Sequence, residues 1–395
     1  MNLFGMNKPF QVLIHTNLGT NDIYDVSTLA HNIQHSTFLH GSPGKLSFIL
    51  EKDPKNILEI SLGYGVSFRY DGKNVFYGYI FKIGTDRTEA YQVTAYDQLR
   101  YFANHDYLNC VDMSLVDLFE TICSRTETKP YSIKSTKGRN KIRDKHFCDV
   151  SYFDMMKYAI DDYMKVYKGK NRLSKKEYFV DDYRLGDFTR SEVMENYMFF
   201  VRDNFGTLEL HEVSEKYMDD SERNGGALII GTGSLLLDYK YDIDIDSNTY
   251  TQILAICNTN KKTDDGNELN TRHALKPDGT SDISYFDVQK RYGILRKVVN
   301  VKNVFANDDE FNKELNNYCE LFLDVLNKPS KTAKLDALGV TGLNAGDCFV
   351  FQLDKLNVKQ SVYITSATHN YDADMHTMSL EIAAIDNMPE TLGRT

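Results

Sequence analysis

No stretch of the sequence is long and apolar enough to cross a membrane as a helix. Such a span needs about 18 or more uncharged apolar residues, and the longest apolar run, Ala227 to Leu237, is interrupted by a Gly-Thr-Gly-Ser segment. The N-terminus also lacks the basic region, long apolar stretch and small-residue cleavage site of a signal peptide. We therefore expect no membrane anchor and assembly in the cytoplasm.

Paired cysteines and an excess of basic residues are also missing. The 6 cysteines form no CxxC pair, so we predict reduced, mostly buried thiols rather than a zinc site or a disulfide framework. Lys and Arg number 46 against 56 Asp and Glu, which gives a net charge of -10. This balance argues against sequence-specific nucleic-acid binding, which needs a basic surface.

A pattern of alternating strands occurs twice in the chain, at residues 65–97 and 346–386. In each copy a glycine opens an alternating strand, and a polar turn and a second strand follow. The third strand closes with Val-Thr-Ala-Tyr-Asp in the first copy and Ile-Ala-Ala-Ile-Asp in the second. Period-two alternation is typical of a sheet with one buried face. The repeat predicts two related β-barrels, and a chance match of short strands is the alternative.

Helical patterns separate the strand-rich parts. Residues 114–125 and 151–168 each carry an apolar face and begin with Ser-x-x-Asp, a capping-box spacing, and residues 308–327 carry a third apolar face. At 395 residues the chain exceeds one ordinary core. We predict an α+β, mainly β fold, with two related β-barrel domains, two α/β accessory modules and a discontinuous second barrel. The predicted limits are 1–103 for the first barrel, 104–212 for an α+β domain, 213–260 and 330–387 for the second barrel, 261–329 for an inserted α+β module and 388–395 for a tail.

Two motifs suggest ligand chemistry, but neither is complete. Residues Asp242, Asp244 and Asp246 have the spacing that begins a calcium loop, yet Ser247 and Ile253 stand where the loop needs glycine and glutamate. The Gly-Thr-Gly-Ser segment at 231–234 lacks the third glycine of a dinucleotide loop and precedes a strand. A strand and a tight hairpin are the better interpretations.

Histidines are the remaining candidates for chemistry. His31 and His35 are four residues apart, and a solvent-exposed loop or strand explains them better than a metal site. His369 and His376 flank a hairpin turn, across which they could meet, and a structural role is expected. The sequence has no GxSxG or HExxH motif and no convincing acid pair. We predict no catalytic residue, no cofactor and no metal, and therefore no enzyme.

Three segments resemble the baseplate hub proteins of contractile phage tails. They are YQVTAYDQL at 91–99, RYGILRK at 291–297, and a C-terminal LxxGDxFxF run followed by YITSATHNYDADMHTMSLEI. More narrowly, they are similar to the hubs of PBSX-type defective prophages and of R-type, phage-tail-like bacteriocins. The resemblance covers about residues 8–386, and the charged stretch at 170–192 departs from the family pattern.

The resemblance implies a homotrimer in which each chain gives two similar barrels, so that six barrels adapt the sixfold tail tube to the threefold central spike. The implied location is the baseplate of a virion or tail-like particle. The implied partners are the tail tube or a tube-initiator protein, the central spike protein, a tape-measure protein and a LysM-type baseplate protein. On this hypothesis, strands after Glu89 and Thr377 join neighbouring barrels by edge pairing. The candidate interface residues are Tyr91, Val93, Met378, Leu380 and Ile382.

Two other functions remain open on the sequence. A cell-wall glycan-binding module of the same particle would use the abundant aromatic residues, 26 Tyr and 22 Phe, but these are spread through both predicted barrels rather than gathered at one tip. A wall hydrolase would need an acid pair or a metal site with a nucleophile.

Overall fold

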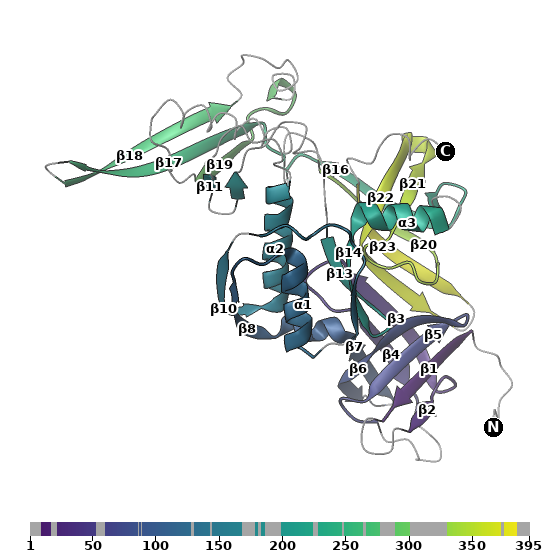
Figure 1. Ribbon diagram of the computed structural model, residues 1–395. Coiled ribbons are helices and arrows are strands. Elements are labelled where there is room, and N and C mark those ends of the chain that lie inside the picture. The colour runs from purple at the N-terminus through teal and green to yellow at the C-terminus, as the bar shows by residue number, and fades with distance from the viewer. Residues whose placement is uncertain are drawn as a thin grey trace. The chain divides into compact units, whose positions relative to one another are not determined.

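A computed structural model shows a mainly β chain whose described residues include the helices α1, α2 and α3 and a short helical turn at 289–292 (Figure 1). The chain divides into two compact units, which are described separately. The first contains residues 1–160, 197–240 and 333–395, and the second contains residues 161–196 and 241–332. The described residues are 9–16, 22–52, 60–85, 87, 89–127, 130–142, 144–167, 178–180, 183–185, 199–223, 228–246, 249–263, 266–276, 289–300, 330–372 and 375–384.

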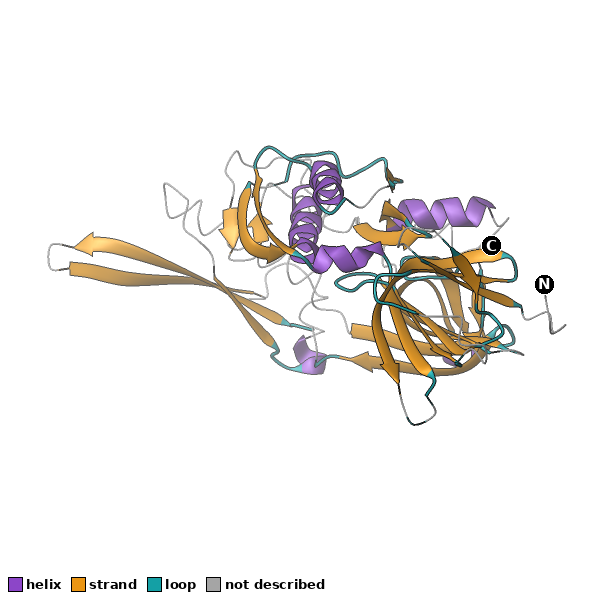
Figure 2. Cartoon of the chain, turned by 90° about the horizontal axis from the view of Figure 1, so that it is seen from below, coloured by secondary structure: helices purple, strands orange, loops and turns teal. Residues whose placement is uncertain are grey.

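A 13-stranded sheet dominates the first unit. Its strands are hydrogen-bonded in the order β16-β20-β23-β22-β3-β4-β7-β6-β5-β1-β2, and β21 adjoins both β22 and β15. Seen from below, these strands curl (Figure 2). Their bounds are β1 Phe10–His15, β2 Ile23–Asp25, β3 Ala30–Phe38, β4 Lys45–Leu50, β5 Gly65–Tyr70, β6 Lys73–Thr85, β7 Tyr91–Tyr96, β15 Ile229–Gly231, β16 Leu236–Asp244, β20 Ser330–Leu338, β21 Cys348–Leu353, β22 Val358–Tyr371 and β23 His376–Ala384.

The sheet contains the same strand order twice. The first strand set is β3-β4-β7-β6-β5-β1, and the second strand set is β16-β20-β23-β22-β21-β15. Each set includes an antiparallel meander, β5-β6-β7 or β21-β22-β23, at the two places where the sequence repeats. The sets differ at one end, because β1 pairs antiparallel with β5 whereas β15 pairs parallel with β21.

Equivalent glycines begin the two meanders. The Gly63 N–H donates to the Ile80 carbonyl over 2.8 Å, and the Gly346 N–H donates to the Ile364 carbonyl over 2.9 Å. Both glycines have a positive φ, of 83° and 90°, which a side chain on an L-residue disfavours. The glycine that corresponds to Gly346 is therefore Gly63, not the Gly65 that opens the first sequence copy.

Both meanders also carry a bulge at the same step. The register shifts between Ile80 and Lys82 of β6 and between Ile364 and Ser366 of β22. Counting from these bulges aligns Ile382 with Ala95, because they pair with Ile364 and Ile80, whereas the sequence pattern alone aligns Ile382 with Val93. Bulges of this kind increase the local twist and bend of a strand.

The order of the second strand set is interrupted along the chain. Strands β15 and β16 precede a three-stranded sheet of the second unit, and β20–β23 follow it. The chain leaves the first unit after residue 240, earlier than the predicted limit at residue 260. Strand β17 is Gln252–Thr263, and it pairs with β18 and β19 rather than with the second strand set. Residues 252–260 were predicted to belong to the second barrel, but they pair with β18 and β19 instead.

An α+β region accompanies the sheet in the first unit. The two predicted Ser-x-x-Asp starts are confirmed, since the Asp117 and Asp154 backbone N–H groups donate to Ser114 and Ser151 over 3.1 Å each. Strands β13 and β14 pair antiparallel as a hairpin. The bounds are α1 Leu115–Arg125, α2 Tyr152–Tyr167, α3 Val213–Arg223, β8 His105–Cys110, β9 Tyr131–Ile133, β10 Lys145–Ser151, β13 Phe199–Asn204 and β14 Thr207–Glu212, with 3-10 helices at Gln98–Ala103 and Asp354–Leu356.

The second unit contains two small sheets. Strands β17 and β18 form a long antiparallel hairpin that ends with Thr263 opposite Gly266, and β19 pairs parallel with β17. The predicted helix at 308–327 lies outside the described residues. Across the part of the chain that the structure describes, no helix has the length and hydropathy to span a membrane. The remaining bounds are β11 Tyr178–Val180, β12 Tyr183–Leu185, β18 Gly266–Lys276 and β19 Arg296–Asn300.

Candidate functional site: the junction of the two strand sets

Strands β3 and β22 join the two strand sets into one sheet. They pair antiparallel, with His35 opposite His369. Side chains reinforce the pairing, because the Gln34 amide donates to the Asn370 Oδ1 over 3.0 Å. The junction is thus a set of long-range backbone and side-chain hydrogen bonds between segments at opposite ends of the chain.

Three histidines are buried at this junction. The His369 Nδ1 lies 2.9 Å from the His376 Nε2, and the His369 Nε2 lies 2.6 Å from the Leu343 carbonyl. Because a carbonyl only accepts, the His369 Nε2 carries the proton and its Nδ1 accepts from His376. The His35 and His369 rings stack with centroids 6.3 Å apart. His369 and His376, for which a structural role was expected, therefore do meet across the hairpin. The expected exposure of His35 was wrong, because only 3% of it is exposed.

Burial keeps these imidazoles neutral. It lowers the pKa of His35 to about 3 and that of His376 to about 4, with a smaller effect from His369 in each case. Aromatic rings surround the cluster: Tyr371 stacks on His376 at 4.2 Å and Phe76 meets His35 edge-on at 5.6 Å. Among the described residues, no group of three or more His, Cys, Asp or Glu side chains is placed to hold a metal ion.

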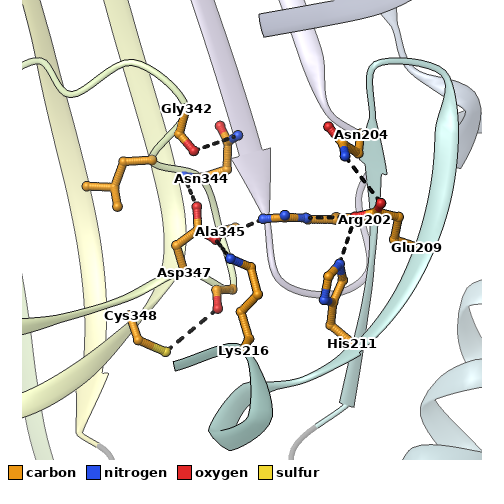
Figure 3. A network of polar contacts seen from close by, with 12 residues as sticks. Arg202, Asn204, Glu209, His211, Lys216, Gly342, Asn344, Ala345, Asp347 and Cys348 are labelled. Carbon is orange, nitrogen blue, oxygen red and sulfur yellow. Dashed lines mark hydrogen bonds and ion pairs between the residues drawn. The ribbon is translucent and has the colours of Figure 1, made fainter. Parts of the chain in front are cut away.

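A second buried network lies where β13, β14 and α3 contact the second meander (Figure 3). The Asp347 carboxylate accepts from the Arg202 guanidinium at 2.8 Å and faces the Lys216 ammonium at 3.0 Å. Burial alone would raise the pKa of Asp347, but the two cations lower it below its usual range. Glu209 lies on the other side of Arg202, with 3.7 Å between their nearest ion-pair atoms, and 2.9 Å from His211. The network fixes the α+β region to this meander.

The Asp203 carboxylate connects the β13–β14 hairpin to the end of the first meander, and Asp97 lies nearby. Asp97 accepts from the Gly44 and Leu99 N–H groups over 2.9 and 3.0 Å, and Asp203 accepts from the Gln98 N–H over 3.2 Å. Burial raises the pKa of Asp203 to about 6, and burial and the nearby Asp203 charge raise that of Asp97 well above its usual range. The Asp97 and Asp203 carboxylates thus accept hydrogen bonds from backbone N–H groups, which is a structural role.

The five predicted interface residues lie on interior strands of the sheet. Tyr91 and Val93 belong to β7, which pairs with β4 on one side and β6 on the other. Met378, Leu380 and Ile382 belong to β23, which lies between β20 and β22. Neither strand offers a free edge along these residues, so the edge pairing expected of them is not available. Their contact with a neighbouring barrel in an assembly stays a prediction.

Sequence reasoning missed β3 and β22 as the strands that join the two sets. The β3 segment, AHNIQHSTF, has many polar residues, and its left-handed Asn32, with a φ of 52°, breaks the alternation. The length of β22 is the signal that could have revealed this junction. Strand β22 has 14 residues and β21 has 6, so part of β22 needs a second partner strand.

The fold is that of phage tail proteins. The chain is similar to the 43 kDa tail protein of prophage MuSo2 from Shewanella oneidensis, with a TM-score of 0.60 at 10% identity over 95% of this chain and 99% of that one. It is also similar to the tail protein from Neisseria meningitidis MC58, with a TM-score of 0.56 at 11% identity over 96% and 97% of the two chains. No curated protein matches the chain.

The family follows from the sequence match. The model of the YQBQ-like family matches residues 33–383, so the chain belongs to that family. Family and fold together confirm the resemblance to baseplate-type phage tail proteins.

Proposed function

We propose that this chain is the structural hub of the baseplate in a contractile tail or tail-like particle. The observation that carries the proposal is the strand order that occurs twice in one sheet. Each strand set forms one barrel, the second discontinuous in sequence, and three chains place six such barrels in a ring. The β3–β22 junction fixes the two barrels of one chain side by side.

Such a ring solves a mismatch of symmetry. A closed trimer of a chain with two similar modules presents six similar edges on one face and threefold symmetry elsewhere. We propose the sixfold tail tube or a tube-initiator protein as the partner on one face, and the threefold spike on the other. A tape-measure protein and a LysM-type baseplate protein are further proposed partners. The chain itself contributes positioning rather than catalysis.

The test is the absolute mass of the purified full chain in solution by light scattering, alone and with its spike protein. We expect a particle near three times 45.4 kDa, and a ring of six similar densities in electron micrographs. A monomer that stays monomeric with the spike would contradict the hub. Co-sedimentation with purified cell walls, or release of wall fragments, would then favour the glycan-binding or hydrolase alternative.

A further inference from the structure

Two exposed turns have the same place in the two strand sets. The first connects β5 to β6 at Asp71 and Gly72, and the second connects β21 to β22 at residues 354–357. Each begins with an aspartate, Asp71 or Asp354. Each ends with a left-handed residue immediately before the next strand, Gly72 with a φ of 73° or Asn357 with a φ of 51°. The second turn is longer, but the two turns are counterparts in the repeat.

Both turns lie at the same end of the sheet. From β22 to β6 the sheet passes through β3, β4 and β7, and each step along this path is antiparallel. The path has an even number of steps, so β22 and β6 run in the same direction. The turns that precede β6 and β22 therefore emerge at one end of the sheet, and the β6–β7 and β22–β23 loops emerge at the other.

Each turn region carries two exposed cations and one exposed carboxylate, which gives it a positive charge in a chain whose net charge is -10. None of these six side chains forms an ion pair with another described residue. By contrast, the exposed Lys52 and Lys334 have carboxylate partners in Glu89 and Glu381. The charged residues of the two turn regions are Arg69, Asp71 and Lys73 in the first strand set and Asp354, Lys355 and Lys359 in the second.

The opposite end of the sheet does not repeat its chemistry in this way. The β6–β7 loop carries Arg87 and Glu89, and Glu89 pairs with Lys52 over 2.7 Å. The described residues of the β22–β23 loop are Asp372 and Met375, and Met375 is 53% exposed. The described parts of these two loops therefore present different groups to a partner.

We infer that the β5–β6 and β21–β22 turns form the face of the hub that contacts the sixfold tail tube, and that the tube presents a ring of acidic side chains to them. The inference rests on the proposed hub and assigns one end of its barrels to one partner. A sixfold partner needs the same chemistry at six positions, and three chains with two such turns each supply it. An acidic ring would neutralise the six positive turns and fix the rotational register of tube on hub.

The test is a charge reversal in each turn of the full chain. Lys73→Glu and Lys359→Glu are made singly and together, since both lysines are exposed, and light scattering checks that each variant is a trimer. Co-sedimentation with the purified tail-tube protein of the same particle then measures binding. We expect the double variant to bind at least about tenfold more weakly than the wild type. The two single variants should lose affinity equally, because a sixfold contact uses both turns alike.

The matched control reverses two cations at the opposite end of the same sheet. Lys52→Glu with Arg87→Glu makes the same change in net charge, and it should bind the tube protein as the wild type does. Higher ionic strength should weaken wild-type binding and narrow its difference from the double variant.

The outcomes separate this inference from the hub itself. If trimers form and the double variant binds the tube protein like the wild type, the assignment of the turns is overturned while the hub stands. It is also overturned if only one single variant loses affinity, if the control loses as much, or if the loss falls on the spike protein instead. A trimer that does not bind the tube protein contradicts both the assignment and the proposed adaptor. A chain that stays monomeric with its spike contradicts the hub, and the assignment fails with it.

Discussion

The buried histidines at the β3–β22 junction make a defined contribution to the pH dependence of stability. Burial lowers the pKa of His35 from 6.5 to about 3. A group whose pKa is lower in the folded chain stabilises the fold fully above the unfolded pKa, and this contribution is lost as the pH falls toward the folded value. Acidification from pH 8 to pH 5 should therefore weaken the junction.

Proton linkage gives the size of the effect. With a pKa of 6.5 in the unfolded chain and about 3 in the folded one, His35 alone removes about 2 kcal/mol of stability between pH 8 and pH 5. Asp203 acts in the opposite direction, because its pKa of about 6 in the folded chain adds about 1 kcal/mol over the same interval. The wild-type chain therefore shows only the balance of these contributions, and a variant is needed to separate them.

The assay is urea unfolding of the wild type and of His35→Gln at pH 8 and pH 5, at one protein concentration. We expect the wild type to lose about 2 kcal/mol more than His35→Gln over this interval, whatever the stability of the variant at pH 8. His31→Gln is the matched control, since His31 lies on the same strand with its side chain 43% exposed, and it should follow the wild type. Equal losses in His35→Gln and wild type would refute the reasoning.

The repeat and the buried ion pairs give two further predictions, both measured by urea unfolding at pH 8. Gly346→Ala should destabilise the fold by several kcal/mol, because a Cβ there would lie 2.2 Å from Phe200. Its counterpart Gly63→Ala has nothing within 4 Å of the added Cβ and should lose only about 1 to 2 kcal/mol, because an L-residue disfavours the left-handed backbone. Equal losses in the two variants would contradict the packing argument. Asp347→Asn should lose about 3 to 5 kcal/mol, because it removes the buried negative charge that the Arg202 guanidinium and the Lys216 ammonium share. A loss below about 1 kcal/mol would mean that the network is open to water.

Local structure was predictable where it depends on local periodicity and capping. The meander strands follow the alternation of Val66, Phe68 and Phe351, all buried as the pattern requires. Helix α1 follows from Ser114, whose side chain and that of Asp117 form the expected capping box. In these segments the residues that determine the element lie within it, so the sequence alone is sufficient.

Long-range pairing was not predictable in the same way. The β3–β22 junction joins segments separated by more than 300 positions. No local pattern predicts which of several polar strands will pair with β22. The interface residues proposed on β7 and β23 illustrate the problem. Their alternation is that of a strand with one buried face, and it carries no information on whether that strand is interior or at an edge. His35 was likewise expected to be exposed, because its burial depends on the partner strand β22.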